Sequence, residues 1–489
     1  MIFQFFLSIT IAILIRVFIA LHSPKISEMN FEKQQQIMEF TTKNSIKNWF
    51  ENQKTSNKQR IDFSPLSGYH SWLNGQIARM IDPQIVSRTH SKKDEGINQI
   101  FMRWTVIIAD LVLYFPALAL MVEDSSSNTN QAVQWLAMAL QPALLLIDHA
   151  YFQYNSISIA FCLIAIYFIK LNKKILAFFF YSLAFFYNSN TLVFALPFVL
   201  YSLGLWISDS FDEEIDQNPK NKKIHPFMSN LFFLSILIAF IFLSFWFPFN
   251  NPKKIILENF QKIFYPFETQ TNSEKDIANI WSVMSKIIPF QKRFSVLKLK
   301  IGSSILTSIF SMIINTHLFF KPTTRNLNLA LFNTSLAFFL FGFQFNEEFI
   351  LFPLIIATFM LQDAKIGLYM LWFILIGTFS LFPFMLTEKI FTPCILLPVL
   401  FILISWKIVS FLGHFKKLKI SLFISVLICL FSLIPFFFQS STKFTFTFTF
   451  TFTFIFIFLS WIFFLYHQFF PFNLWFLFQK KNLKTKKNQ

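Results

Sequence analysis

The stretch IGLYMLWFILIGTFSLFPF, residues Ile366–Phe384, decides the fold class of this chain. It contains no charged side chain, and an α-helix needs about 20 apolar residues to cross the hydrocarbon core of a bilayer. Comparable apolar runs occupy Met1–Leu21, Asn230–Phe249 and Ile420–Phe438. The sequence therefore predicts an all-α polytopic membrane protein.

The composition agrees with this prediction. Of 489 residues, 55% are hydrophobic and only 14% are charged, whereas a soluble domain carries about 25% charged residues. The chain contains 42 Lys and Arg residues and 25 Asp and Glu residues, which gives a formal net charge of +17. These cations lie in separate short loops, so a membrane surface is the expected partner and nucleic acid is not.

Apolar runs and the breaks between them predict about fourteen spanning helices. Their ranges are 2–21, 103–121, 132–148, 156–169, 175–188, 191–208, 229–249, 301–319, 327–344, 349–363, 366–386, 390–406, 420–438 and 445–468. The last contains the Phe-Thr repeat Phe444–Phe454, whose period of two is typical of a strand. A lone strand in hydrocarbon would leave its backbone unpaired, so a helix is predicted there as well.

With a cytosolic N-terminus, the basic clusters between these spans fall on one side, which is the positive-inside pattern. They are Lys170/Lys173/Lys174, Lys220/Lys222/Lys223, Lys321/Arg325, Lys416/Lys417/Lys419 and Lys480–Lys487. The predicted organisation is a first transmembrane helix (1–21), a luminal catalytic loop (22–102), transmembrane helices (103–249), a luminal loop (250–300), transmembrane helices (301–468) and a basic cytosolic tail (469–489).

Strongly polar side chains at or near membrane depth are candidates for a functional role, because inserting each charged group into the membrane costs roughly 2.5–3.5 kcal/mol. Those predicted at span interiors or ends are Asp110, Asp148, His149, Glu347 and Glu348. They indicate either a functional cavity or ordinary hydrogen bonds between helices and at the interface. In the first loop, Ile61–Trp72 (IDFSPLSGYHSW) adds a carboxylate, a proline-set turn and a histidine beside aromatic rings, a combination suited to a sugar.

Several of these segments resemble, in order, motifs of the endoplasmic-reticulum α-1,3-glucosyltransferases that glucosylate the nine-mannose lipid-linked oligosaccharide. Ile61–Trp72 is similar to L-D-Y-P-P-L-T-A-Y-H-S, and Phe101–Leu111 (FMRWTVIIADL) to F-M-R-x-T-V-L-x-A-D-L. Leu146–Ser156 (LIDHAYFQYNS) is similar to L-I-D-H-G-H-F-Q-Y-N-S. Asp276–Trp281 and Phe343–Glu348 match two further motifs, K-V-A-N-F-W and F-Q-V-H-E-K. The Tyr-His-Ser of the first motif favours the enzyme that adds the first glucose over its sibling that adds the second.

The resemblance implies a GT-C-type fold with a luminal active-site face in the endoplasmic-reticulum membrane. The tail Lys486-Lys487-Asn488-Gln489 is similar to a di-lysine retrieval signal for that membrane, although a solvated basic tail is the alternative. The implied donor is dolichyl-phosphate glucose and the implied acceptor a lipid-linked oligosaccharide. A β-linked donor and an α-linked product imply inversion by a single displacement. No cofactor or metal is expected, because neither a nucleotide loop nor a D-x-D pair is found in the sequence.

This chain departs from the family at the first-loop motif G-D-F-E-A-Q-R-H-W-M-E-I-T, which aligns with Met29–Thr41 (MNFEKQQQIMEFT). Asn30 stands in place of the aspartate that is taken to be the family's base, and Gln35 and Gln36 replace its Arg and His. An amide cannot accept the proton of the acceptor hydroxyl. The catalytic residues are therefore expected to be Glu32 as the base and Asp62 as a carboxylate that positions the substrate.

The resemblance and the polar segments together predict the substrate-binding residues. Arg103, with His70 or His149, is expected to donate to the phosphate of the donor, and Gln344 and Glu347 to orient sugar hydroxyls. The full predicted set is His70, Arg103, Asp148, His149, Gln153, Asn155, Gln344 and Glu347. For Arg103 the alternative is a side chain that snorkels from the end of a span.

Two other classes of function remain open at this point. A non-catalytic family member that binds lipid-linked sugar is favoured by Asn30 and by Asn346, which replaces the histidine of V-H-E-K. A transporter also combines many spans with intramembrane carboxylates. The absence of a repeat between the two halves and the clustering of motifs on the luminal side argue against a transporter.

Overall fold

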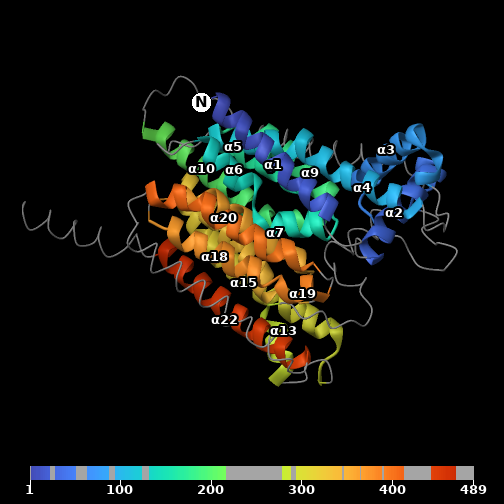
Figure 1. Ribbon diagram of the computed structural model, residues 1–489. Coiled ribbons are helices and arrows are strands. Elements are labelled where there is room, and N and C mark those ends of the chain that lie inside the picture. The colour runs from blue at the N-terminus through green and yellow to red at the C-terminus, as the bar shows by residue number, and fades with distance from the viewer. Residues whose placement is uncertain are drawn as a thin grey trace, which may run out of the picture. The chain divides into compact units, whose positions relative to one another are not determined.

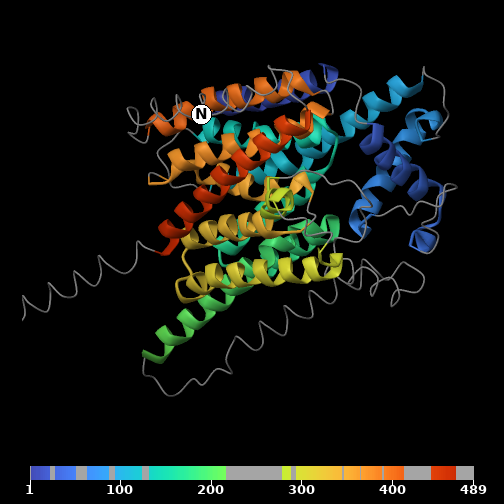
Figure 2. The same ribbon diagram turned by 90° about the horizontal axis from the view of Figure 1, so that it is seen from below.

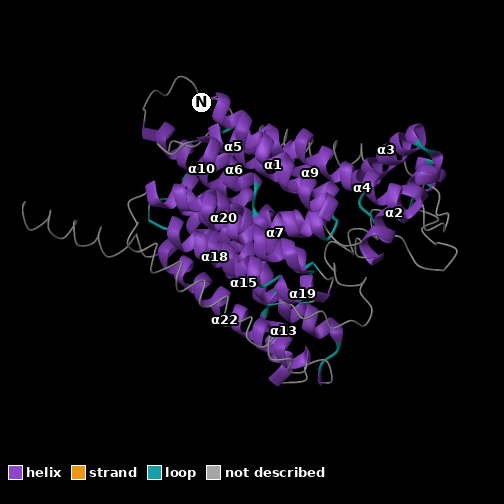
Figure 3. Ribbon diagram, viewed as in Figure 1, coloured by secondary structure: helices purple, strands orange, loops and turns teal. Residues whose placement is uncertain are grey.

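The computed structural model describes residues 2–22, 28–50, 63–86, 94–123, 131–215, 278–287, 293–343, 346–363, 365–387, 390–411 and 442–469. Within these ranges all regular secondary structure is helical, as Figure 3 shows. The prediction of an all-α protein is confirmed for this part of the chain. The chain divides into unit 1 (Met1–Leu192, Asn218–Ser273 and Thr358–Ile424) and unit 2 (Val193–Gln217, Glu274–Ala357 and Ser425–Gln489).

Unit 1 contains the N-terminal helices and a later group, and Figure 1 labels most of their α-helices. They are α1 (Ile2–His22), α4 (Asp94–Ala109), η3 (Asp110–Tyr114), α5 (Phe115–Glu123), α6 (Gln131–Ala139), α7 (Pro142–Leu144), η4 (Leu145–Ala150), α8 (Asn155–Lys170), α9 (Lys174–Tyr187), η7 (Met360–Gln362), α18 (Gly367–Phe379), α19 (Phe382–Thr387) and α20 (Phe391–Phe411). Both η3 and η4 are π-helices. The predicted span 132–148 is therefore broken, because α6 ends at Ala139 and Pro142 starts a new turn.

The predicted first luminal loop is largely helical where the structure describes it. It forms α2 (Glu28–Lys43), η1 (Ile46–Asn48), α3 (Pro65–Ile81) and η2 (Pro83–Ile85), and α4 begins at Asp94, before the predicted boundary. Figures 1 and 2 show α2 and α3 side by side. Gly75 permits this approach, since a Cβ at that position would collide with Thr42 of α2. The first loop thus supplies a closely packed helical pair.

Unit 2 is built from a second set of helices. They are α10 (Ala195–Ile215), α13 (Ile280–Ile287), α15 (Val296–Phe320), α16 (Thr324–Phe341), η6 (Glu347–Ile350) and α22 (Thr442–Phe469). Two elements cross the division between the units, η5 (Ser189–Phe194) and α17 (Leu351–Phe359).

The Phe-Thr repeat is helical, as predicted, and forms part of α22. After the repeat, Trp461 and Phe464 pack edge-to-face against Phe310 of α15 and Phe332 of α16. Gln468 receives a 2.6 Å hydrogen bond from the Asn333 amide. A buried amide pair of this kind fixes the register of neighbouring helices in an apolar environment.

Five described segments are long and apolar enough to cross a membrane. They are Phe3–His22, Asn98–Glu123, Ser189–Ile207, Val296–Phe320 and Gly367–Met385. Shorter apolar helices coincide with other predicted spans, including Asn155–Lys170 and Lys174–Tyr187. The predicted spans 229–249 and 420–438 lie outside the described residues, so a total of fourteen stays a prediction.

The packing of α10 on α15 gives a stability test. A Cβ at Gly204 would collide with the backbone oxygen of Phe319, which cannot rotate away. We expect Gly204→Ala to lower the free energy of unfolding by about 1–3 kcal/mol, the usual cost of overpacking. Thermal unfolding of the detergent-solubilised protein measures this effect.

Gly302 of α15 is the matched control, because a Cβ there would meet nothing within 4 Å. Gly302→Ala is expected to stabilise the helix by about 0.5–1 kcal/mol, since alanine has the higher helix propensity. Equal shifts in the two variants would contradict the close approach of α10 and α15.

Candidate functional site

His70 lies on α3 at the point where this helix meets the end of α9. Its Nε2 is 3.1 Å from the Asn74 amide nitrogen, and its Nδ1 is 3.2 Å from the Tyr187 hydroxyl. The ring also packs edge-to-face on Tyr154, with centroids 4.9 Å apart. When the amide donates to Nε2, the neutral imidazole carries its proton on Nδ1 and donates to Tyr187. Both ring nitrogens of this predicted phosphate ligand thus have protein partners.

Burial lowers the pKa of His70 to about 4, from an ordinary value of 6.5. The imidazole is therefore neutral at physiological pH. It cannot serve as a cation for the donor phosphate in this arrangement, although a neutral ring can still hydrogen-bond.

This pKa leads to a prediction about pH. Between about pH 4 and 6.5 the unfolded chain binds a proton at this position that the folded chain excludes, so stability rises with pH across this window. The contribution is present above the unfolded pKa and is lost as the pH falls, by at most about 3 kcal/mol. We expect His70→Gln to flatten the pH dependence of thermal unfolding measured from pH 4.5 to 7.5.

His22 gives the control, since it is an exposed histidine at the end of α1. His22→Gln should leave the pH dependence as it is in the wild type. An unchanged slope in His70→Gln would show that His70 is not the half-buried neutral group described above.

Asp148 organises the start of α8. Its carboxylate is fully buried, and its Oδ2 accepts a 2.6 Å hydrogen bond from the Ser156 backbone N–H. Its Oδ1 accepts a 3.1 Å bond from the Asn155 amide, which also lies 2.6 Å from Gln153 Oε1. Asn188, after α9, donates to Asn155 Oδ1 at 3.2 Å. These residues form one hydrogen-bonded amide belt: Asp148, Gln153, Asn155 and Asn188.

The turn that carries this belt has an unusual backbone. Phe152 has a φ of +74°, which a bulky residue rarely adopts, and its side chain is 1% exposed. Such conformations cost about 1–3 kcal/mol and persist only where the surroundings determine them. Phe152 packs against Phe31 of α2 and Tyr154, at centroid distances of 6.3 and 5.6 Å.

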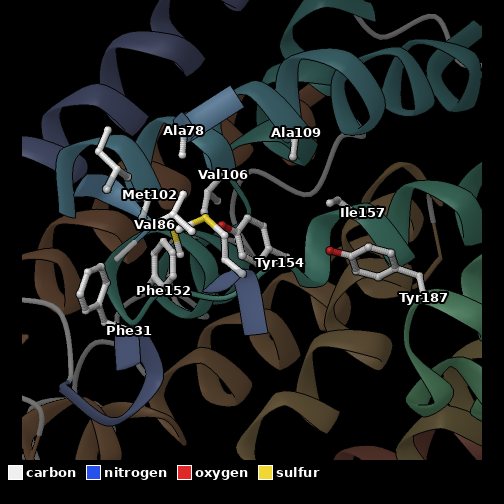
Figure 4. Close-up of a cluster of buried hydrophobic side chains, with 12 residues drawn as sticks. Phe31, Ala78, Val86, Met102, Val106, Ala109, Phe152, Tyr154, Ile157 and Tyr187 are labelled. Atoms are coloured by element: carbon white, nitrogen blue, oxygen red, sulfur yellow. The ribbon is translucent and has the colours of Figure 1, made fainter. Parts of the chain in front are cut away.

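A hydrophobic cluster holds these segments together, as Figure 4 shows. It joins α2, α3, η2, α4, the turn before α8, α8 itself and the end of α9. Its buried members are Phe31, Met38, Ala78, Ile85, Val86, Met102, Val106, Ala109, Phe152, Tyr154, Ile157 and Tyr187. Three motif-bearing segments that are far apart in sequence are thus packed around one core.

Arg103 and Asp110, both from the second motif, are buried and form hydrogen bonds with residues of other segments. Arg103 Nη1 donates to the Ile19 carbonyl of α1 at 3.3 Å. Asp110 Oδ2 accepts from Arg16 Nε at 2.6 Å and lies 2.9 Å from His149 Nε2. His149 is 4% exposed and belongs to the same π-helix as Asp148.

Within unit 2, the fourth motif contacts the fifth through Trp281, which packs edge-to-face on Phe343, and it also contacts the end of α16 just before the fifth motif. The Asn279 amide donates to the Gly342 carbonyl at 3.1 Å, and Trp281 Nε1 donates to the Phe341 carbonyl at 2.6 Å. Asn279 also caps α13 by accepting from the Ser282 N–H. Glu347 begins η6, and its side chain is buried.

Of the two predicted catalytic carboxylates, only Glu32 lies among the described residues. Glu32 is exposed on α2, two residues after Asn30. Asp62 and Gln344 lie outside the described residues. The assignment of Glu32 as base and Asp62 as positioning carboxylate stays a prediction, as do the substrate-binding roles.

Four residues that the sequence did not single out complete these networks: Arg16, Asn74, Tyr187 and Asn188. Arg16 could have been found from the sequence, because it is a lone cation inside the first apolar run and such residues often mark functional sites. Asn74 lies one turn after His70, a spacing that places both on one face of a helix. Tyr187 and Asn188 end an apolar run and resemble ordinary interfacial residues.

The helices, the apolar segments long enough to span a membrane and the polar belt at the helix ends together define a membrane protein that is helical throughout its described residues and has a buried polar cluster. The sequence profile of the ALG6, ALG8 glycosyltransferase family matches residues 12–475. The chain belongs to this glycosyltransferase family.

Curated relatives support the assignment. A Drosophila melanogaster protein, named probable dolichyl pyrophosphate Man9GlcNAc2 alpha-1,3-glucosyltransferase, is 30% identical over 381 residues, covering 77% of each chain. A Dictyostelium discoideum protein of the same name is 30% identical and covers 77% of this chain and 72% of its own length. The Gallus gallus dolichyl pyrophosphate Man9GlcNAc2 alpha-1,3-glucosyltransferase is 30% identical, with coverages of 74% and 70%. The family resemblance predicted from the motifs is confirmed.

Proposed function

We propose that this protein transfers glucose from dolichyl-phosphate glucose to the lipid-linked oligosaccharide Man9GlcNAc2, forming an α-1,3 linkage for protein N-glycosylation. The observation that carries the proposal is the convergence of Ile61–Trp72, Phe101–Leu111 and Leu146–Ser156. In the described part of these segments, His70, Thr105 and Tyr154 are linked by ring packing and by a 2.7 Å hydrogen bond. The family match and the names of the relatives support the same reaction.

The proposed chemistry is one inverting displacement. A carboxylate takes the proton of the acceptor hydroxyl as its oxygen attacks C1 of glucose, and the bond from C1 to the phosphate oxygen breaks. Dolichyl phosphate leaves with the bonding electron pair and is stabilised by hydrogen-bond donors. Glu32 and Asp62 are the proposed carboxylates, and Arg103, buried at the start of a span, is the proposed phosphate ligand.

We further propose that about fourteen helices span the endoplasmic-reticulum membrane and that residues 22–102 face the lumen. The one-sided distribution of Lys and Arg supports this orientation. It places α2, α3 and the polar belt on the side where the glucose-accepting oligosaccharide would be presented.

Glycosylation mapping checks this orientation. Gln59→Thr completes a sequon at Asn57, and we expect that site to be modified in cells because it would face the lumen. Lys484→Thr completes a sequon at Asn482 in the basic tail, which is the matched control and should stay bare. Modification of the tail with a bare Asn57 would mean that the orientation is inverted.

Complementation tests the reaction itself. We expect this chain, expressed in cells that lack the enzyme adding the first glucose, to convert Man9GlcNAc2 to the species one hexose heavier. Mass spectrometry of the released lipid-linked oligosaccharides measures the conversion. Well-expressed protein with no hexose addition would contradict the proposal.

A second candidate is a family member that binds lipid-linked sugar without turnover. The observation favouring it is Asn30, an amide where the family carries its base. Purified protein that is thermally stabilised by dolichyl-phosphate glucose but transfers none of it would select this candidate over the enzyme.

A further inference from the structure

Three charged or titratable side chains from three separate helices meet inside unit 1. Arg16 of α1, Asp110 of η3 and His149 of η4 are 0%, 0% and 4% exposed. Asp110 Oδ2 is 2.6 Å from Arg16 Nε and 2.9 Å from His149 Nε2. Arg16 also donates to the Ala139 carbonyl at 3.0 Å and lies over the Phe115 ring. We name Arg16, Asp110 and His149 the buried triad.

The triad is costly, and packing alone does not require it. Arg16 and Asp110 both lie within segments apolar enough to span a membrane. Burying an ion pair costs several kcal/mol per ion before its attraction is recovered, and apolar side chains of similar volume often stabilise a fold as well or better. A buried triad in such helices is therefore expected to have a role beyond holding α1 in place.

The local backbone points to the same conclusion. Asp110 is the first residue of the π-helix η3, and His149 lies in the π-helix η4. A π-helix inserts an extra residue into a helical turn, and such turns occur frequently at functional sites. Here two of them occur together, with the Asp110–His149 contact between them.

The triad determines how the His149 ring is held. An Asp110 carboxylate paired with Arg16 is ionised and can only accept, so His149 Nε2 must donate to it. When the imidazole is neutral, Nδ1 is left as an acceptor. His149 adjoins Asp148, whose carboxylate receives the Asn155 and Ser156 N–H groups at the start of α8. Arg16 is thus linked through the Asp110 and His149 side chains to η4, the π-helix that also carries Asp148.

We propose that Arg16 is a positioning residue for glucose transfer, which acts through Asp110 to hold His149 and the adjoining amide belt in the geometry that the donor requires. This inference rests on the proposed function. It adds to the three motifs a residue of α1 that none of them contains.

The test compares four variants of the full-length protein in detergent: Arg16→Met, Arg16→Lys, Arg16→Met with Asp110→Leu, and the exposed control Arg79→Met. We expect Arg16→Met to lower kcat by about 10²-fold, the effect of a small misplacement at a reacting centre, with the acceptor KM changed less than about threefold. Arg16→Lys keeps the charge and should recover part of the loss. Arg79→Met should match the wild type.

The double variant separates positioning from simple charge compensation. Removing both charges should restore thermal stability toward the wild type, because no uncompensated ion stays buried, while kcat stays low because His149 has lost its carboxylate. Wild-type kcat in Arg16→Met, or recovery of kcat together with stability in the double variant, would overturn the inference.

A binding measurement distinguishes failure of this inference from failure of the proposed function. If the wild type transfers no glucose, the proposed function fails, and the thermal shift caused by dolichyl-phosphate glucose decides the role of Arg16. A shift present in the wild type and absent in Arg16→Met would support positioning of the donor. Equal shifts in the two proteins, or no shift in either, would overturn it.

Discussion

Replacing Asn30 by aspartate is expected to raise the rate of glucose transfer, with an upper limit of about 10²- to 10⁴-fold, the usual contribution of a positioned general base. Asn30 lies on α2 where the family carries an aspartate, and an amide cannot take the proton of the acceptor hydroxyl. A wild type without that base depends on another carboxylate of the first loop. Transfer from dolichyl-phosphate glucose, measured on the purified protein, gives the rate.

The same experiment identifies the substitute base. Glu32→Gln and Asp62→Asn are each expected to abolish the residual activity of the wild type. Glu39→Gln is the matched control for the same helix, because Glu39 forms only an exposed ion pair with Lys43, which contributes little. Asn44→Asp adds the same charge just after α2 and should leave the rate unchanged.

Two results would count against this account. A wild type that is already fast and indifferent to both carboxylate substitutions would place the site elsewhere. If every variant were folded but silent, Asn30→Asp included, the protein would belong with family members that bind lipid-linked sugar without turnover.

Asp148→Ala is expected to lower the free energy of unfolding by about 2–4 kcal/mol. The substitution leaves the Ser156 N–H in the first turn of α8 and one Asn155 donor bond without their acceptor in a buried setting, at about 1–3 kcal/mol for each buried group left unsatisfied. Because Gln153 and Asn155 would lose their anchor, glucose transfer should fall as well.

Asp82 offers the matched comparison, since its carboxylate caps the short helix η2 through one exposed 2.8 Å bond from Gln84. Asp82→Ala should cost less than about 1 kcal/mol. Thermal unfolding of both variants measures the difference. Similar losses in the two would mean that Asp148 is not the buried acceptor for α8.

Local composition was sufficient to predict that the protein is helical and where many of its helices lie. Runs such as Ile366–Phe384 have few ways to satisfy a backbone in hydrocarbon, so their helical structure follows from length and polarity alone. The same argument correctly predicted a helix for the Phe-Thr repeat, against its strand-like period. The motifs were likewise sufficient for the family, because their order and residue identities do not depend on the fold.

The partners of the polar residues were decided only by the tertiary structure. His70 and Asp148 were visible in the sequence as polar residues, but their contacts with Tyr187 and Ser156 depend on how α3, α8 and α9 pack. The helices of the first loop were missed, because the α2–α3 pair is held by contacts with each other and with α9 and not by a strong local signal. Arg16 meets Asp110 across 94 residues of chain. Local periodicity carries no information about such a pair, since helix packing alone determines which buried charges lie within hydrogen-bonding distance.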